Sequence, residues 1–209
     1  WMKKACMGQI GIDSKKIKVI SPKINLNIIR YFNPSKTNMG TFFFPAGAES
    51  YKNHKIIVES CKKLKKQAMN DYNVIFTLKG NENDSIATLY EEVKELDLPI
   101  KFVGGLPRED VFELYTKSIL IFPSYIETFG LPMLEARLHK TIILASNCPF
   151  SNEILEGYEN AYFFNPFNSR ELMNLMEKAI MNNIEYKECD EDIGSMSGNG
   201  WAGLLNELY

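Results

Sequence analysis

Short, unbroken apolar runs are the feature that most restricts the fold of this 209-residue chain. Such runs predict six strands, at residues 41–44, 73–78, 100–103, 118–122, 141–145 and 161–164. Strands that are apolar on both faces are typical of a parallel sheet that is covered by helices on both sides. The segments between them carry apolar side chains at helical spacing and predict helices over residues 53–69, 85–97, 108–117, 132–139, 150–156 and 169–182. Right-handed crossovers then give an α/β fold with a doubly wound, Rossmann-like parallel sheet and helices on both faces.

The regular pattern covers only part of the chain, which sets the expected domain limits. Residues 41–185 are expected to form one Rossmann-like domain. Residues 1–40 combine a polar helical segment (1–16), a brief strand (17–20) and an irregular, Asn-rich stretch. Residues 186–209 are acidic and then Gly/Ser-rich, with a short helical piece at 201–209. The chain begins Trp1-Met2, unlike a natural start, which indicates an excised piece of a longer protein.

Composition and charge exclude several classes of protein. The formal net charge is −2, which gives no support for non-specific nucleic-acid binding. The four cysteines are scattered and only two histidines accompany them, so no zinc-ligand spacing exists and we expect no metal. No apolar run approaches the length of a membrane span. A reduced, cytoplasmic protein is therefore the expectation.

Two glutamates eight positions apart, Glu127 and Glu135, mark the segment that says most about function. Glu127 is expected on the loop after a strand, and Glu135 in the first turn of a helix that Pro132 opens. Ahead of this helix, unpaired N–H groups and the helix dipole favour an anion at three residues: Phe129, Gly130 and Leu131. A phosphorylated sugar suits this arrangement. The alternative is structural, since a loop glutamate is usually solvated and a glutamate near a helix start complements the dipole.

The loops expected at the carboxyl ends of the strands resemble those of a known family. The ordered matches are residues 46–53, 78–80, 100–107, 127–136 and 142–153, and the segment from Glu127 to Ala136 is similar to an E-x₇-E signature. Together they resemble the C-terminal, nucleotide-sugar-binding half of the retaining GT-B glycosyltransferases of group 1, often called family 4. A lone E-x₇-E would be a weak signal, whereas five matches in order are specific.

The resemblance implies roles for individual residues. Lys52 would neutralise the diphosphate of the donor, Glu127 would face the transferred sugar, and Glu135 would accept hydrogen bonds from the ribose. The other donor-binding residues would be the amides of the Phe129–Gly130–Leu131 segment, the strand-end Gly80, Leu106 in the base pocket, and Gly47 in the diphosphate loop. Many members of the family have an arginine where this chain has Gly47, so the usual pair of cations on the diphosphate is incomplete.

The implied activity is a metal-independent hexosyl transfer with retention, from a nucleotide-diphosphate-sugar to a saccharide or lipid-linked acceptor in polysaccharide biosynthesis. No cofactor is expected. A missing N-terminal Rossmann-like domain would supply the acceptor side, so the isolated chain is expected to bind donor without turnover. Contact with the inner membrane surface stays open. Two alternatives remain: a non-catalytic nucleotide-sugar-binding subunit, and a GT-B-like nucleotide-sugar epimerase, which would need catalytic His and acidic residues that are not evident.

Overall fold

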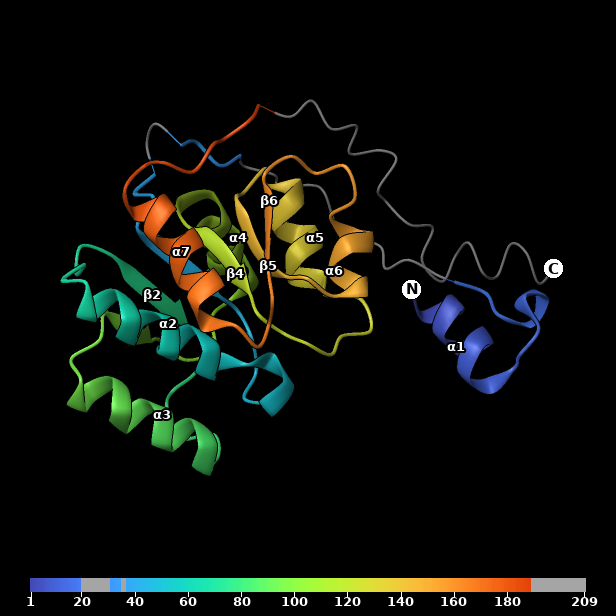
Figure 1. The fold of residues 1–209 in the computed structure, drawn as a ribbon, viewed down its shortest axis with the longest axis horizontal. Helices are drawn as coiled ribbons and strands as arrows, with labels where there is room; N and C mark the ends of the chain where they lie inside the picture. The colour runs from blue at the N-terminus through green and yellow to red at the C-terminus, as the bar shows by residue number, and fades with distance from the viewer. Residues whose placement is uncertain (20–30, 35–36, 189–209) are drawn as a thin grey trace. The chain divides into compact units, whose positions relative to one another are not determined.

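The computed structural model describes residues 1–19, 31–34 and 37–188 (Figure 1). The chain divides into two compact units, one of residues 1–29 and 188–209 and the other of residues 30–187. The first unit contains α1 (Met2–Ile10) and a 3-10 turn, η1 (Ser14–Lys16). The predicted helix over residues 1–16 is too long, because Gly11 adopts a left-handed φ of 68° that ends α1. Residues 17–19 do not form the predicted strand; Ile20 and the predicted helix at 201–209 lie outside the described residues.

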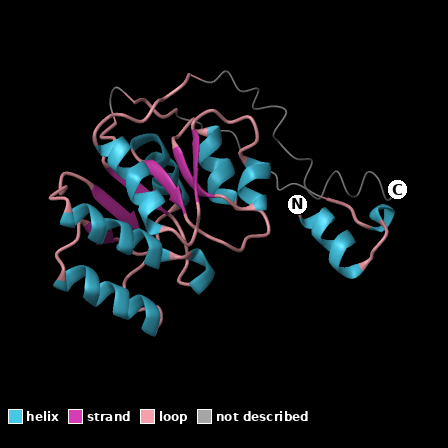
Figure 2. Ribbon diagram, viewed as in Figure 1, coloured by secondary structure: helices cyan, strands magenta, loops and turns pink. Residues whose placement is uncertain are grey.

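The second unit contains a six-stranded parallel sheet in the order β3-β2-β1-β4-β5-β6 (Figure 2). Its strands are β1 (Thr41–Phe44), β2 (Asn73–Phe76), β3 (Ile100–Phe102), β4 (Ile119–Phe122), β5 (Ile143–Ser146) and β6 (Ala161–Phe164). All six predicted strands are present, and the doubly wound, Rossmann-like fold is confirmed. The order reverses between β1 and β4, so the crevice in which such sheets bind ligands lies beyond the carboxyl ends of these two strands.

Helices cover both faces of the sheet. They are α2 (His54–Lys66), α3 (Asp84–Glu95), α4 (Arg108–Lys117), α5 (Leu131–Leu138), α6 (Pro149–Ile154) and α7 (Ser169–Ile180), with a 3-10 turn, η2 (Ser50–Lys52), before α2. Helix α2 packs against α3 and α7, whereas α5 packs against α4 and α6. In Figure 1, α2 and α7 lie in front of the strands and α4 lies behind them. No helix within the described ranges combines the length and the hydropathy that crossing a bilayer requires.

The central strand β1 shows why the apolar runs are unbroken. Phe43 packs against Tyr115 of α4, with ring centroids 5.8 Å apart. The next residue, Phe44, packs against His54 of α2 at 4.7 Å. Successive side chains of a strand point to opposite faces, so β1 needs an apolar residue at every position when both faces are covered. All three phenylalanines of β1 are fully buried, and each contributes about 2–3 kcal/mol to folding.

Two element boundaries differ from prediction in ways that affect the site. Strand β2 ends at Phe76 rather than at residue 78, because the Thr77 hydroxyl accepts the N–H of Ala46 in the β1 loop (3.1 Å). Helix α5 begins at Leu131, one residue early, because Gly130 caps it with a φ of 85°. Glu135 therefore lies in the second turn of α5, and its expected place in the first turn is wrong.

Candidate functional site

The loops that follow the strands are joined to one another at the carboxyl edge of the sheet. Tyr125 after β4 donates its N–H to the carbonyl of Tyr51 after β1 (3.1 Å). The amide side chain of Asn83 after β2 donates to the carbonyl of Ala48 (2.9 Å). Gly104 after β3 donates its N–H to Leu78 (2.9 Å). These hydrogen bonds bring the loops that carry the predicted site residues together at one edge.

The two predicted catalytic residues meet directly. Lys52 is the last residue of η2, and Glu127 lies in the loop after β4. The Lys52 Nζ atom is 2.6 Å from Glu127 Oε1, and the two side chains are 19% and 12% exposed. Asn53 fixes this position: it takes a left-handed φ of 63°, and its side chain donates to the carbonyl of Pro123, four residues before Glu127 (3.2 Å). A cation and a carboxylate from separate loops therefore share one partly buried site.

The start of α5 presents backbone N–H groups beside this pair. Gly130 is buried with a φ of 85°, and a Cβ atom there would lie 2.6 Å from Met133 Cε. Glycine is thus favoured by the left-handed backbone conformation, and a larger residue would also displace the end of the Met133 side chain. The N–H groups of the Phe129–Gly130–Leu131 segment donate to no acceptor within the described residues. Open N–H groups at a helix start suit an anionic ligand.

Glu135 lies behind this helix start with partners on both carboxylate oxygens. Arg108 Nη2 donates to Oε1 at 2.8 Å, and the Tyr115 hydroxyl donates to Oε2 at 3.2 Å. Burial raises the pKa of Glu135 above its ordinary value, while the Arg108 guanidinium and the Tyr115 hydroxyl act in the opposite direction. Burial, with the Glu135 charge beside it, raises the pKa of Tyr115 well above its ordinary value, so that group stays a hydroxyl donor.

Sequence reasoning did not identify Arg108 or Tyr115. A signal was present for Arg108, which is the first residue of α4 after the N-cap Pro107. The positive end of the helix dipole disfavours a cation there, so an arginine at this position indicates a partner elsewhere. No comparable signal marks Tyr115, because a buried tyrosine in an amphipathic helix is ordinary core.

The structure gives Gly80 a structural reason to be glycine. It has a φ of 97°, and an added Cβ would lie 2.5 Å from the Tyr90 ring. Its N–H already donates to Glu82 Oε2 (3.1 Å). Desolvation raises the pKa of Glu82, but the hydrogen bonds from the backbone N–H groups of residues 79–82 together hold it below the ordinary value. The amide of Gly80 is therefore occupied within the protein.

Leu106 and Gly47 lie in loops at the same edge but contact neither glutamate in any recorded interaction. Leu106 is half-buried, two residues before Arg108. Gly47 is exposed, and an added Cβ would lie 2.6 Å from a carboxylate oxygen of Glu49. The loop therefore places an acid beside Gly47.

The two histidines stay without a site role. Burial lowers the pKa of His54 to about 4, and its ring packs between Phe44 and Phe76. His139 places Nδ1 2.7 Å from the Glu135 carbonyl, and burial lowers its pKa. Within the part of the chain that the structure describes, no three His, Cys, Asp or Glu side chains gather as metal ligands.

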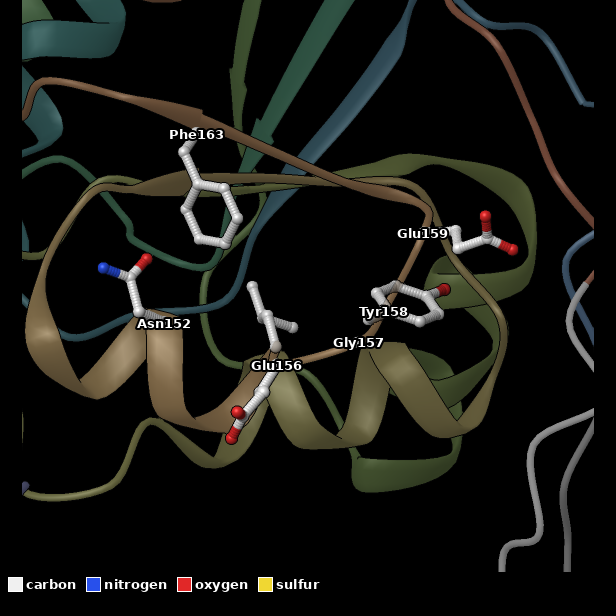
Figure 3. Close-up of a pocket in the computed structure, with 7 residues that line it drawn as sticks. Asn152, Glu156, Gly157, Tyr158, Glu159 and Phe163 are labelled. Atoms are coloured by element: carbon white, nitrogen blue, oxygen red, sulfur yellow. The ribbon is translucent and has the colours of Figure 1, made fainter.

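Two hollows are found in this unit, and one of them borders the site loops, since Asn53 and Tyr125 line it. A cavity of about 690 Å³ between α2 and α3 reaches Tyr125 and Phe167. A second one, of about 380 Å³, lies between the end of α6 and Phe163 of β6 (Figure 3). Neither is lined by Lys52 or by the two glutamates. The candidate site is thus a set of loops along the sheet edge rather than an enclosed pocket.

Known proteins place the chain in a family. The profile of glycosyl transferases group 1 matches residues 27–194. The O-antigen chain mannosyltransferase RfbU of Salmonella typhimurium is 30% identical over 160 residues, which is 75% of this chain and 42% of RfbU. The serotype-specific mannosyltransferase WbdA of Escherichia coli is 34% identical over 107 residues, 50% of this chain and 13% of WbdA. The chain spans less than half the length of these curated relatives.

Solved structures agree on the fold. Anabaena HepE in complex with UDP and glucose superposes with a TM-score of 0.70 at 18% identity, covering 87% of this chain and 52% of HepE. A glycosyltransferase from Rickettsia africae gives a TM-score of 0.67 at 20% identity, covering 88% of this chain and 57% of that one. These identities speak for the fold alone, whereas the profile spans most of the sequence. The chain belongs to glycosyl transferases group 1.

Proposed function

We propose that this chain is the donor-binding, C-terminal half of a retaining, family 4-type GT-B glycosyltransferase. It would bind a nucleotide-diphosphate-sugar whose hexose is transferred to an acceptor hydroxyl. The observation that carries the proposal is the pairing of Lys52 with Glu127 at 2.6 Å, with the open N–H groups of residues 129–131 at the helix start that follows. A cation, amide donors and a carboxylate then lie at the carboxyl edge of the sheet. A diphosphate joined to a sugar requires these groups as binding partners.

Each residue contributes one element of the reaction. When the bond between sugar and diphosphate breaks, negative charge grows on the diphosphate, and Lys52 and the amides at Gly130 would stabilise it. Glu127 would accept hydrogen bonds from hydroxyls of the sugar, and Glu135 from those of the ribose. We propose that these groups stabilise the leaving diphosphate without a divalent cation. Retention is proposed on the resemblance to retaining members of the family.

The acceptor side would come from a domain that these residues do not contain. The curated relatives are more than twice as long as the segment matched, and this chain covers 52% of HepE. We propose that a preceding Rossmann-like domain binds a saccharide or lipid-linked acceptor, at the cytoplasmic surface of the inner membrane. RfbU and WbdA are named mannosyltransferases, which makes mannose the first sugar to test.

Nucleotide binding tests the donor site in this chain alone. UDP, GDP and ADP are titrated by calorimetry and thermal shift, with and without EDTA. One of them should raise the melting temperature as its occupancy rises, and EDTA should leave the affinity unchanged. Lys52→Met should weaken that nucleotide about tenfold or more, since it removes a charge-assisted contact to the diphosphate.

Lys55→Met is the matched control, because Lys55 is exposed three residues further along the chain. It should bind as the unmodified chain does. Failure of all three nucleotides to bind at millimolar concentration would contradict the donor site, and loss of binding in EDTA would contradict metal independence. In the full-length protein, unchanged transferase activity after Glu127→Ala would favour the non-catalytic subunit instead.

A further inference from the structure

Arg108 links the start of α4 to the neighbouring helix α5. It follows the Leu106–Pro107 turn and is the first residue of α4. Its guanidinium reaches across to α5, where Nη2 is 2.8 Å from Glu135 Oε1. The Arg108 side chain is 59% exposed, whereas that of Glu135 is 11% exposed. An exposed cation therefore holds a nearly buried carboxylate.

The helix dipole does not account for this arginine. A cation in the first turn opposes the helix dipole, while Glu109 and Asp110 in the same turn favour it. The guanidinium lies over the Phe112 ring, 4.9 Å from its centroid, and also contacts Glu135. The contact with α5 is the one recorded hydrogen bond that this side chain makes in the described part of the chain.

The Glu135 carboxylate needs such a partner. Its surroundings favour the neutral acid, because desolvation raises its pKa. Arg108 and the Tyr115 hydroxyl each bind one carboxylate oxygen and favour the ionised form. A carboxylate has about four lone-pair sites, so two are left for other donors once these bonds are made. Two donors in fixed directions also set the plane of the carboxylate.

We propose that Arg108 is a positioning residue that keeps Glu135 ionised and oriented to accept the ribose hydroxyls of the donor nucleotide. Tyr115 holds the second oxygen from the interior. This inference rests on the proposed function, because it assigns Glu135 to a ribose. It adds the residue that makes a buried carboxylate usable as an acceptor of hydrogen bonds.

Ribose-dependent binding tests the role of Arg108. Kd is measured from pH 5 to pH 8 for UDP, GDP and their 2′,3′-dideoxy analogues, with Arg108→Met, Arg108→Lys and Tyr115→Phe variants. Arg108→Met should raise the Kd of the ribose nucleotide about tenfold at pH 7 and leave that of the dideoxy analogue within about twofold. As the pH is lowered, the affinity of this variant for the ribose nucleotide should begin to fall at a higher pH than that of the unmodified chain. The reason is that Glu135 without Arg108 protonates more easily.

Conservative variants separate positioning from folding. Arg108→Lys should recover part of the affinity that Arg108→Met loses. Tyr115→Phe should also move the loss of affinity at low pH to a higher pH. Arg170→Met removes an exposed arginine at the start of α7 and should change neither Kd nor the pH profile. A dideoxy nucleotide weakened as much as the ribose nucleotide by Arg108→Met would overturn the proposal, as would unchanged binding of both.

A measurement that needs no nucleotide keeps this inference distinct from the proposed function. The carboxyl carbon of Glu135 is titrated by NMR in the unmodified chain, in Arg108→Met and in Arg170→Met. The pKa of Glu135 should rise in Arg108→Met alone, and an unchanged pKa would overturn the role of Arg108. If none of the nucleotides binds the unmodified chain, the proposed function fails, while this titration still decides whether Arg108 keeps Glu135 ionised.

Discussion

The ion pair between Lys52 and Glu127 would have to break for the proposed donor to bind to Lys52. The two atoms are 2.6 Å apart and neither side chain is much exposed, so under the proposed function a diphosphate oxygen would have to replace the carboxylate on the lysine. A nucleoside diphosphate would therefore compete with Glu127 for Lys52. For a nucleotide-sugar, breaking the ion pair would cost less binding free energy, because the released carboxylate would accept hydrogen bonds from the sugar hydroxyls.

Glu127→Gln should therefore act in opposite directions on the two ligands. It should bind the nucleoside diphosphate about fivefold more tightly, since Lys52 is no longer paired, which corresponds to about 1 kcal/mol for a partly exposed ion pair. It should bind the nucleotide-sugar no more tightly, because a charge-assisted contact to the sugar is lost. Calorimetry with both ligands measures this, and Glu156→Gln, an exposed acid after α6, controls for net charge. Weaker binding of the diphosphate by Glu127→Gln would contradict the competition.

At the scale of the element, the cap of α5 links the fold to the site. Gly130→Ala imposes a left-handed φ of 85° on a residue with a Cβ and brings that Cβ within 2.6 Å of Met133 Cε. We expect a loss of about 1–2 kcal/mol in the free energy of unfolding, and weaker diphosphate binding because the amides ahead of α5 shift.

Gly157 offers a matched control for this substitution. It has a similar φ of 71°, but an added Cβ there meets no atom within 4 Å. Gly157→Ala should therefore show the backbone strain alone, of about 1 kcal/mol, with nucleotide affinity unchanged. Urea unfolding and calorimetry on both variants give the comparison. Equal effects on affinity would show that the position of Gly130 in the site is unimportant.

The N-terminus of α2 carries a pH dependence of stability. Burial lowers the pKa of His54 from 6.5 to about 4, so the folded protein binds this proton less readily than the unfolded chain. Its contribution is fully present above pH 6.5 and is lost as the pH falls toward 4, by up to about 3 kcal/mol. His54→Leu should flatten the stability profile between these pH values, measured by urea unfolding. A profile as steep as that of the unmodified chain would assign the acid sensitivity to another group.

At the scale of the whole molecule, the proposed division of labour predicts separable activities. This chain should bind donor but transfer no sugar to an acceptor, because under the proposed function the surface that orients the acceptor would belong to another domain. Joining it to the proposed Rossmann-like acceptor domain should restore transfer, measured as nucleoside diphosphate release. Sugar transfer by these residues alone would show that the acceptor site lies within them.

Much of the fold could be predicted because local rules apply to it. Unbroken runs such as residues 41–44 are required where a strand is covered on both faces, so the six strands and their parallel arrangement follow from the pattern. The boundaries were less certain, because they depend on single contacts such as the Thr77 hydroxyl that ends β2. The glutamate spacing and the glycine before α5 also followed from local geometry.

By itself, the sequence determined the fold class, the edge at which the loops gather, and the family of this chain. Only the tertiary structure decided which side chains meet there. Lys52 and Glu127 are 75 residues apart in sequence, and Arg108 and Glu135 are 27 apart. Strand order and helix packing bring such pairs within 3 Å, and neither leaves a periodic signal in the chain. Local patterns arise from each element's own geometry, whereas a pair between loops depends on how all the elements pack.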